Sequence, residues 1–122
     1  MVALIANEPL RSLVDRYATS ADAHARATDA GDSSAANDAF EAISTIYREL
    51  RRRGISAQRA LLPLLHDPRP GVRGWAGAHA LEFAPDDGER TLTVLSETSS
   101  SLVGFSAKIT FQEWRAGKLR FP

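Results

Sequence analysis

Apolar residues recur at spacings of three and four along most of this chain, which is the period of amphipathic α-helices. Residues 8–29 are therefore predicted to form a first helix, and residues 35–53 a second one. Pro9 suits the start of the first helix, and Gly31 separates the two. The apolar stripe predicted for the second helix consists of Ala36, Phe40, Ile43, Ile46, Tyr47 and Leu50. The run Arg51-Arg52-Arg53-Gly54 is expected to end this helix, because cations interact favourably with the exposed carbonyl groups there.

The stretch from Ala60 to Leu81 predicts two short helices that fold back on each other. The first of them, residues 56–65, contains four closely spaced leucines: Leu61, Leu62, Leu64 and Leu65. The segment Asp67-Pro68-Arg69-Pro70 then breaks the helix, because proline lacks an N–H donor and disfavours helix at its predecessor. The apolar stripe of the second helix, residues 70–84, consists of Val72, Trp75, Ala76, His79, Ala80 and Phe83. Small residues on its opposite side allow close approach, so we expect this helix to be covered on two sides.

Residues 86–98 and 100–116 are predicted to form a final pair of helices, followed by a tail over residues 117–122. A shift of 30 positions relates the central pair to this final pair, aligning Leu62 with Leu92, Leu65 with Leu95, Gly74 with Gly104 and Trp75 with Phe105. Leu119 and Phe121 of the tail are expected to pack back onto the last helix. The whole pattern predicts a single all-α domain of about six helices in antiparallel pairs, without a strand.

Residues 60–83 also resemble a HEAT-like repeat of the armadillo type, through Leu-Pro-Leu-Leu, Asp-Pro-x-Pro-x-Val-Arg and the small residues that follow. This resemblance implies a short right-handed α-solenoid over residues 1–122, in which helix pairs stack side by side. Its parts would be an N-terminal helix pair (8–53), a central repeat (56–84) and a C-terminal repeat (86–116). The chain is similar, too, to a small bacterial family of helical domains of unknown function, which implies the fold and no activity. His79 departs from the repeat pattern, which has a small apolar residue there.

The composition excludes several classes of function. The chain has no cysteine, so disulfides, thiolate catalysis and cysteine-ligated zinc are excluded. No stretch approaches the ~20 apolar residues of a membrane span, and the apolar segment at residues 1–7 is too short for a signal sequence. We therefore expect a cytoplasmic protein that does not contact a membrane.

The formal net charge is zero, but the charges are unevenly distributed. Residues 1–45 hold three Arg and seven Asp or Glu, a net charge of −4. Residues 46–80 hold seven Arg and two acids, a net charge of +5, whereas residues 81–122 hold five Lys or Arg and six acids, a net charge of −1. Segments of opposite sign attract each other within one small domain, so these charges are expected to pair internally.

No arrangement of residues indicates catalysis or a cofactor. No two of the three histidines, His24, His66 and His79, have the i, i+3 or i+4 spacing of helical metal ligands. His79 and Glu82 lack a third ligand, and the acids at positions 86–89 lack the spacing of a calcium loop. We therefore expect a protein that is not an enzyme and holds no metal or cofactor, with His79 half-buried on the core stripe and making one hydrogen bond.

Two functional hypotheses remain. The first is a non-enzymatic protein-interaction or regulatory module that binds a protein partner or itself through the groove of a short solenoid. The candidate partner-binding residues are Arg48, Arg52, Arg59, Arg69 and Arg73. Trp75 and Trp114 are either aromatic anchors in that groove or core residues. Arg73 either lies in the groove or, as the resemblance to the repeat implies, bridges to an acid such as Asp67. The second hypothesis, a nucleic-acid-binding module using residues 48–73, is less favoured because the net charge is zero and no lysine cluster exists.

Overall fold

The structure is a computed structural model that describes residues 5–122 of the chain. The apolar segment at the start of the sequence falls mostly on residues 1–4, which lie outside this range. Within it lie α2 (Leu10–Asp29), α3 (Ser33–Arg53), α4 (Ile55–Arg59), the 3₁₀ helix η1 (Leu62–His66), α5 (Pro70–Phe83), α6 (Pro85–Thr98) and α7 (Leu102–Arg115). No strand occurs between residues 5 and 122, so the prediction of an all-helical fold with six α-helices is confirmed. None of the described helices is long and apolar enough to cross a membrane.

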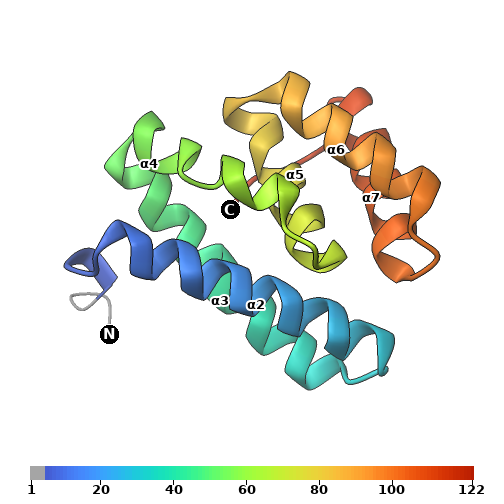
Figure 1. The fold of residues 1–122 in the computed structure, drawn as a ribbon, viewed down its shortest axis with the longest axis horizontal. Helices are drawn as coiled ribbons and strands as arrows, with labels where there is room; N and C mark the ends of the chain where they lie inside the picture. Colours follow the sequence, from blue (N-terminus) through green and yellow to red (C-terminus); the bar gives the residue numbers. More distant parts are fainter. Residues whose placement is uncertain (1–4) are drawn as a thin grey trace.

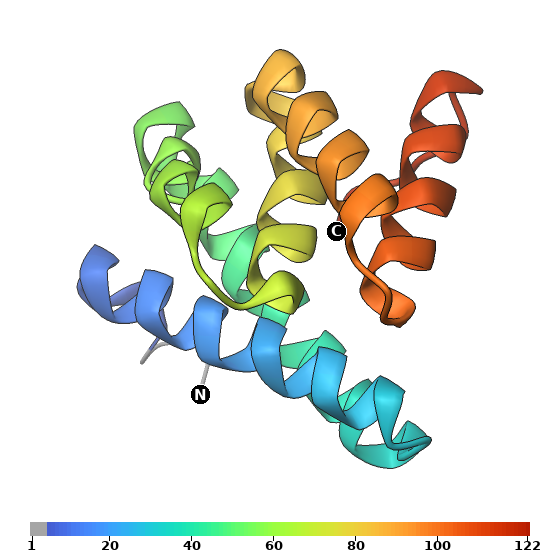
Figure 2. The ribbon, with the colours of Figure 1, turned by 45° about the vertical axis from the view of Figure 1, so that its right-hand side comes forward.

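The helices form two groups on either side of α5. In both views α2 and α3 lie side by side along one edge of the molecule, while α6 and α7 lie on the other side (Figures 1 and 2). α5 contacts α2 on one side and both α6 and α7 on the other. The expectation that this helix is covered on two sides is thus confirmed.

The loop between α2 and α3 is a tight turn with specific caps. Gly31 has a φ of 73°, a left-handed conformation that suits glycine because it has no Cβ. The Asp32 side chain then accepts a hydrogen bond of 3.0 Å from the backbone N–H of Ala35 and caps α3. This short turn forces α2 and α3 to run antiparallel and in contact along their length.

Two hydrophobic clusters lie on the two sides of α5. The larger one joins α2, α3, α4 and α5, and its largest side chains are Leu13, Tyr17, Ile43, Ile46, Tyr47, Leu50, Leu61 and Val72. The smaller one joins α5, α6 and α7 through Leu81, Leu92, Leu95 and Ala107. Leu119 and Phe121 of the tail pack against the smaller cluster, as predicted, and the Phe121 ring lies 6.4 Å from that of Trp114.

Glycines set the close approach of α5 to its neighbours. A Cβ at Gly71 would lie 2.5 Å from the Ala25 Cβ of α2. A Cβ at Gly88 of α6 would lie 2.8 Å from the Gly77 carbonyl oxygen of α5. Both distances are far shorter than any carbon contact that packing allows, so a methyl group at either position would push the helices apart.

The prediction of one helix over residues 56–65 is wrong. α4 ends at Arg59, and a separate 3₁₀ helix begins at Leu62. Pro63 explains the break, because it has no N–H to donate to the Arg59 carbonyl and its ring would clash with that group. The tighter 3₁₀ geometry tolerates a proline at its start, and the Leu64 N–H bonds to the Leu61 carbonyl at 2.9 Å.

One position in the predicted apolar stripes is wrong, and one aligned pair of the internal repeat differs in burial. Phe40 is 43% exposed, whereas its neighbour Ala39 is buried in the α2–α3 contact. Phe105 is 63% exposed, although the 30-residue shift aligned it with Trp75, which is half-buried. On α3 the small Ala39 side chain faces α2, and the ring of Phe40 therefore lies outside the contact.

Candidate binding groove

An open groove runs over the surface of α5, between α2 and α3 on one side and α7 and the tail on the other. One end, which we call the His24 recess, has a volume of about 370 Å³ and is lined by residues of α2, α5 and α7. The other end, the Ser44 recess, has a volume of about 450 Å³ and is lined by α3, α5 and the tail. The two recesses share the residues Phe40, Trp75, Ala78 and Thr110, so they form one groove.

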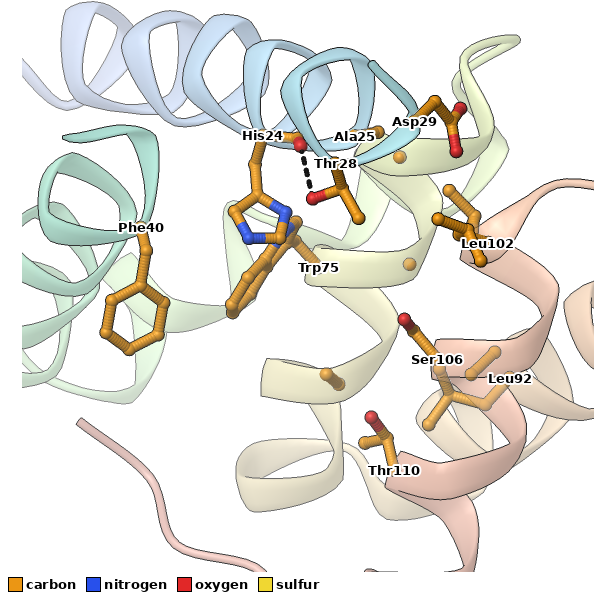
Figure 3. A pocket seen from close by; sticks show the side chains of 15 residues that line it. His24, Ala25, Thr28, Asp29, Phe40, Trp75, Leu92, Leu102, Ser106 and Thr110 are labelled. Atoms are coloured by element: carbon orange, nitrogen blue, oxygen red, sulfur yellow. Dashed lines mark hydrogen bonds between the residues drawn. The ribbon is translucent and has the colours of Figure 1, made fainter. Parts of the chain in front are cut away.

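Trp75 of α5 is the central side chain of this groove. Figure 3 shows the indole between His24 of α2 and Phe40 of α3, with Ser106 and Thr110 of α7 across the opening. The His24 ring meets the Trp75 ring edge-on at 5.1 Å, and the Phe40 ring is tilted at 5.8 Å. Burial lowers the pKa of His24, which favours the neutral imidazole in this apolar setting.

A hydrogen bond within α2 lies in the wall of the His24 recess. The Thr28 hydroxyl donates to the His24 carbonyl oxygen at 2.8 Å, one turn back on α2 (Figure 3). Gly71 and Gly74 of α5 also line the His24 recess. On α5 the recess is therefore lined by these two glycines and by the half-buried ring of Trp75.

A buried polar network lies directly beneath the groove, with His79 at its centre. His79 is only 3% exposed, its ring stacks on that of Tyr47 at 3.9 Å, and its Nδ1 lies 2.5 Å from the Tyr17 hydroxyl. Burial lowers the pKa of His79 to about 3, with a smaller contribution from the positive charge of Arg51. His79 is therefore neutral at physiological pH, with one N–H and one bare nitrogen.

The partners of Tyr17 decide which nitrogen of His79 carries the proton. Tyr17 is fully buried, and burial raises its pKa, so it stays protonated. His79 Nδ1 is the only hydrogen-bond partner of its hydroxyl between residues 5 and 122, so the hydroxyl donates there rather than leave its proton unpaired. The proton of His79 then lies on Nε2.

A second part of the network fixes α3 to α4, α5 and the tail. The Tyr47 hydroxyl donates to Glu82 Oε1 at 2.5 Å and accepts from Gln58 Nε2 at 3.1 Å. Burial, and then the hydrogen bond to Glu82, raise the pKa of Tyr47. Arg51 donates to Glu82 at 3.0 Å and to the carbonyl oxygen of Pro122. Residues far apart in sequence are thus joined through one carboxylate.

Two polar groups that line the Ser44 recess have no partner within the described part of the chain. The Ser44 hydroxyl is buried and makes no hydrogen bond. His79 also lines this recess, and its Nε2 makes no hydrogen bond to any described residue. Buried polar groups in folded proteins almost always have partners, so this end of the groove has unused hydrogen-bonding capacity.

The structure separates the five arginines that the sequence suggested as a binding surface. Arg48 lines the Ser44 recess, and Arg59 is exposed at the end of α4. Arg52 pairs with Glu49 at 2.6 Å, and Arg53 pairs with the same carboxylate at 2.7 Å. These hydrogen bonds lower the pKa of Glu49 to about 2.

The remaining two arginines lie near the turn before α5. Arg69 makes two hydrogen bonds to the Asp67 carboxylate, at 3.0 and 3.1 Å, and they lower the pKa of Asp67. The Asp67–Arg73 bridge, which the resemblance offered as one alternative, does not form, since Arg69 is closer in sequence and bonds both oxygens. Arg73 instead has a buried Nε without a partner. Of the five arginines, Arg48 alone lines the groove.

The arginine run at the end of α3 has a larger role than capping. Gly54 does adopt a left-handed φ of 112° and closes the helix. Arg53, however, also donates to the carbonyl oxygens of Ile5 and Glu8, at 3.0 and 2.7 Å, and Arg51 joins the buried network. The run therefore attaches the segment before α2 and the C-terminal tail to the core.

The two tryptophans have different environments. Trp75 faces the groove, whereas Trp114 packs in the smaller cluster and donates from Nε1 to Glu89 at 3.0 Å. Sequence reasoning missed His24, Phe40 and Ser44 as groove residues. Ser44 had a detectable signal, because it is a hydroxyl within the buried stripe of α3, but the other two depend on how α5 is placed.

The described residues contain no group of three or more histidine, aspartate or glutamate side chains placed to hold a metal ion. Fold and groove together define a small all-helical domain with an open, largely apolar groove. The chain belongs to the family described as a domain of unknown function (DUF2019), whose model matches residues 11–113. The predicted resemblance to a family of helical domains of unknown function is thereby confirmed.

The fold is shared with a solved structure, that of the protein RPA1889 from Rhodopseudomonas palustris CGA009. The two chains superpose with a TM-score of 0.88 and are 21% identical, over 97% of this chain and 98% of the other. At this level of identity the similarity establishes the fold alone. No curated protein matches the sequence.

Proposed function

We propose that this protein is a non-enzymatic interaction module that binds a segment of a protein partner in the groove over α5. The observation that carries the proposal is the continuity of the two recesses past Trp75 and Phe40. Aromatic side chains in a concave, largely apolar surface are typical anchors of binding sites. The exposed position of Phe40 fits this role, because a phenyl ring that is 43% exposed gains by being covered.

A binding role is also supported by the state of the titratable groups. A general base works best with a pKa near the operating pH, whereas that of His79 is about 3. The carboxylates of Glu49 and Glu82 are engaged by arginines. These groups therefore contribute to the stability of the fold and are poorly suited to acid–base catalysis. A binding role for the groove is consistent with this.

The proposal includes a short right-handed solenoid of the HEAT-like type. Contacts between consecutive helices, and between α5 and α7, support this arrangement. In such solenoids the binding surface is the groove formed by successive helices. The α5 groove, bounded by helices from both groups, would be that surface.

The test uses a variant that fills the groove without altering the core. Ser106 is exposed on the α7 wall of the His24 recess, so Ser106→Trp should block the recess while preserving the fold. Ser56, which is exposed on α4 and lines neither recess, provides the matched control Ser56→Trp. Wild type and variants are immobilised and exposed to lysate of the native host.

A protein partner that uses the groove will be retained by wild type and Ser56→Trp and lost with Ser106→Trp. Phe40→Asp, which puts a charge at the shared part of the groove, should weaken retention as well. Circular dichroism and melting temperature of each variant confirm that it is folded. Retention of the same proteins by all variants would show that the groove is not the binding surface.

A further inference from the structure

We propose that the partner segment carries a carboxylate next to an apolar side chain, and that this carboxylate binds in the Ser44 recess. This inference rests on the proposed function, since it specifies what the groove binds. It is carried by the buried and unpartnered Ser44 hydroxyl, by His79 Nε2, which no described residue hydrogen-bonds, and by two unpaired cations in the same recess.

The first observation concerns hydrogen-bond donors. The Ser44 side chain is 3% exposed and its hydroxyl has no partner, although it lines the recess. His79, which is also 3% exposed, carries its proton on Nε2, and this N–H has no acceptor among the described residues. Both groups are satisfied by a ligand that brings hydrogen-bond acceptors.

The position of His79 is fixed before any ligand arrives. Tyr17 holds Nδ1, and Tyr47 stacks on the ring at an interplanar angle of 8°. A donor whose tautomer and orientation are set in advance loses little freedom on binding. The aromatic network beneath the groove thus acts as the support of this donor.

The second observation is the charge of the recess. Arg48 and Arg120 line it, and neither forms an ion pair with a described residue. Arg48 makes only a 3.5 Å contact with the Thr45 hydroxyl. Glu41 is the acidic side chain in the lining, so the side chains of the recess carry two positive charges and one negative charge, a net side-chain charge of +1.

This charge and these donors favour a carboxylate over other polar groups. A carboxylate accepts hydrogen bonds without donating, and its single negative charge is attracted by the two unpaired arginines. A phosphorylated side chain would bring −1.5 to −2, roughly twice that charge. A cationic group would face two arginines and two N–H or O–H donors.

The apolar part of the segment would occupy the His24 recess. Phe40 and Trp75 connect the two recesses, and Leu92, Leu102 and Val103 line the far end. A space of about 370 Å³ accommodates an aromatic or leucine side chain. An apolar residue followed by Glu or Asp therefore fits both ends of the groove.

The experiment compares the peptides acetyl-Phe-Glu-amide and acetyl-Phe-Gln-amide, which are similar in shape and differ in the carboxylate. Binding is followed by the ¹H–¹⁵N signal of the Trp75 indole in the full-length protein. That signal is distinguished from the Trp114 signal with Trp114→Phe. We expect the Glu peptide to bind at least about tenfold more tightly than the Gln peptide at low ionic strength.

Variants then locate the carboxylate. Ser44→Ala and the double variant Arg48→Gln/Arg120→Gln should each remove most of the preference for the Glu peptide. Arg59→Gln, an exposed arginine outside the groove, is the matched control and should retain it. Arg48, Arg59 and Arg120 are exposed, and Ser44→Ala removes only one oxygen atom, so all these variants should remain folded.

Four outcomes would overturn the inference. The first two are equal binding of both peptides and binding of neither at millimolar concentration. The third is that a phosphoserine peptide binds more tightly than the Glu peptide. The fourth is that free 3-phenylpropionate binds as tightly as the Glu peptide. The last would assign the site to a small organic acid. The lysate experiment is independent of these outcomes, because it tests use of the groove without assuming a carboxylate.

Discussion

His79 lies on an otherwise apolar face of α5, and residues of three helices contact its ring. Tyr17 of α2 hydrogen-bonds Nδ1, Tyr47 of α3 stacks on the ring, and Trp75 of α5 lies 5.7 Å away. A small apolar residue would not fill this space and would leave the Tyr17 hydroxyl without its partner. At this position the imidazole links the core of the α2–α3 pair to the floor of the groove.

Burial of neutral His79 predicts that stability falls in mild acid. The pKa is about 3 in the folded protein and near 6.5 in the unfolded chain, so below pH 6.5 the unfolded state binds one more proton. The free energy of unfolding should therefore decrease as pH falls from 6.5 to 5, by up to about 1.4 kcal/mol per pH unit. Urea unfolding at several pH values measures this slope.

A control separates the contribution of His24, which is partly buried. Burial also lowers the pKa of His24, so part of the slope belongs to it. His24→Gln should keep most of the pH dependence, and His79→Gln should lose most of it, at a cost in overall stability. A free energy of unfolding that is constant between pH 6.5 and 5 would contradict the buried neutral state of His79.

At the scale of elements, the close packing of α5 against α6 depends on missing side chains. Gly77 and Gly88 face each other across this contact, and a Cβ at Gly88 would lie 2.8 Å from the Leu81 nitrogen. Backbone atoms cannot rotate away as a flexible side chain can. The distance between the two helices is therefore set by these glycines.

Gly88→Ala should destabilise the protein, even though alanine is the better helix former. Overpacking costs about 1–3 kcal/mol, and we expect the upper part of this range because the backbone atoms cannot move aside. That cost exceeds the roughly 1 kcal/mol by which alanine stabilises a helix relative to glycine. The matched control is Gly74→Ala, whose Cβ would lie 3.4 Å from a Val103 methyl group, an ordinary contact. That variant should be neutral or more stable. Urea unfolding at neutral pH distinguishes them, and equal stability of both variants would contradict the tight α5–α6 contact.

At the scale of the whole molecule, several arginines of the basic central segment form ion pairs within the domain. Arg52 pairs with Glu49, Arg69 with Asp67, and Arg51 with Glu82. Paired charges that are close together produce little long-range field, and the formal net charge is zero. The arginines of residues 48–73 therefore do not form one basic surface.

This arrangement predicts weak binding to nucleic acid. A generic DNA duplex should bind no more tightly than about micromolar near 0.15 M salt, which is the range of non-specific contacts. Fluorescence anisotropy with a labelled duplex measures it. The opposite result would be nanomolar binding that collapses with added salt and with Arg52→Ala plus Arg69→Ala, and it would favour the nucleic-acid hypothesis.

Much of the helical framework follows from the sequence, because helix period, caps and breakers act locally. The period of three and four located α2, α3, α5, α6 and α7 to within a few residues. Gly31 and Pro70 marked real boundaries. The one failure, at residues 56–65, came from weighing four leucines above Pro63, although the proline acts on the backbone directly.

The groove and its chemistry were decided by the tertiary structure. The sequence placed Phe40 in the core and suggested five converging arginines, whereas packing put Phe40 at the groove and left Arg48 alone there. Which side of a helix is covered depends on where other helices lie, and Gly71 and Gly88 set those positions through contacts with residues distant in sequence. A spacing pattern describes one helix at a time. A surface between α2, α5, α7 and the tail exists only after all of them have packed.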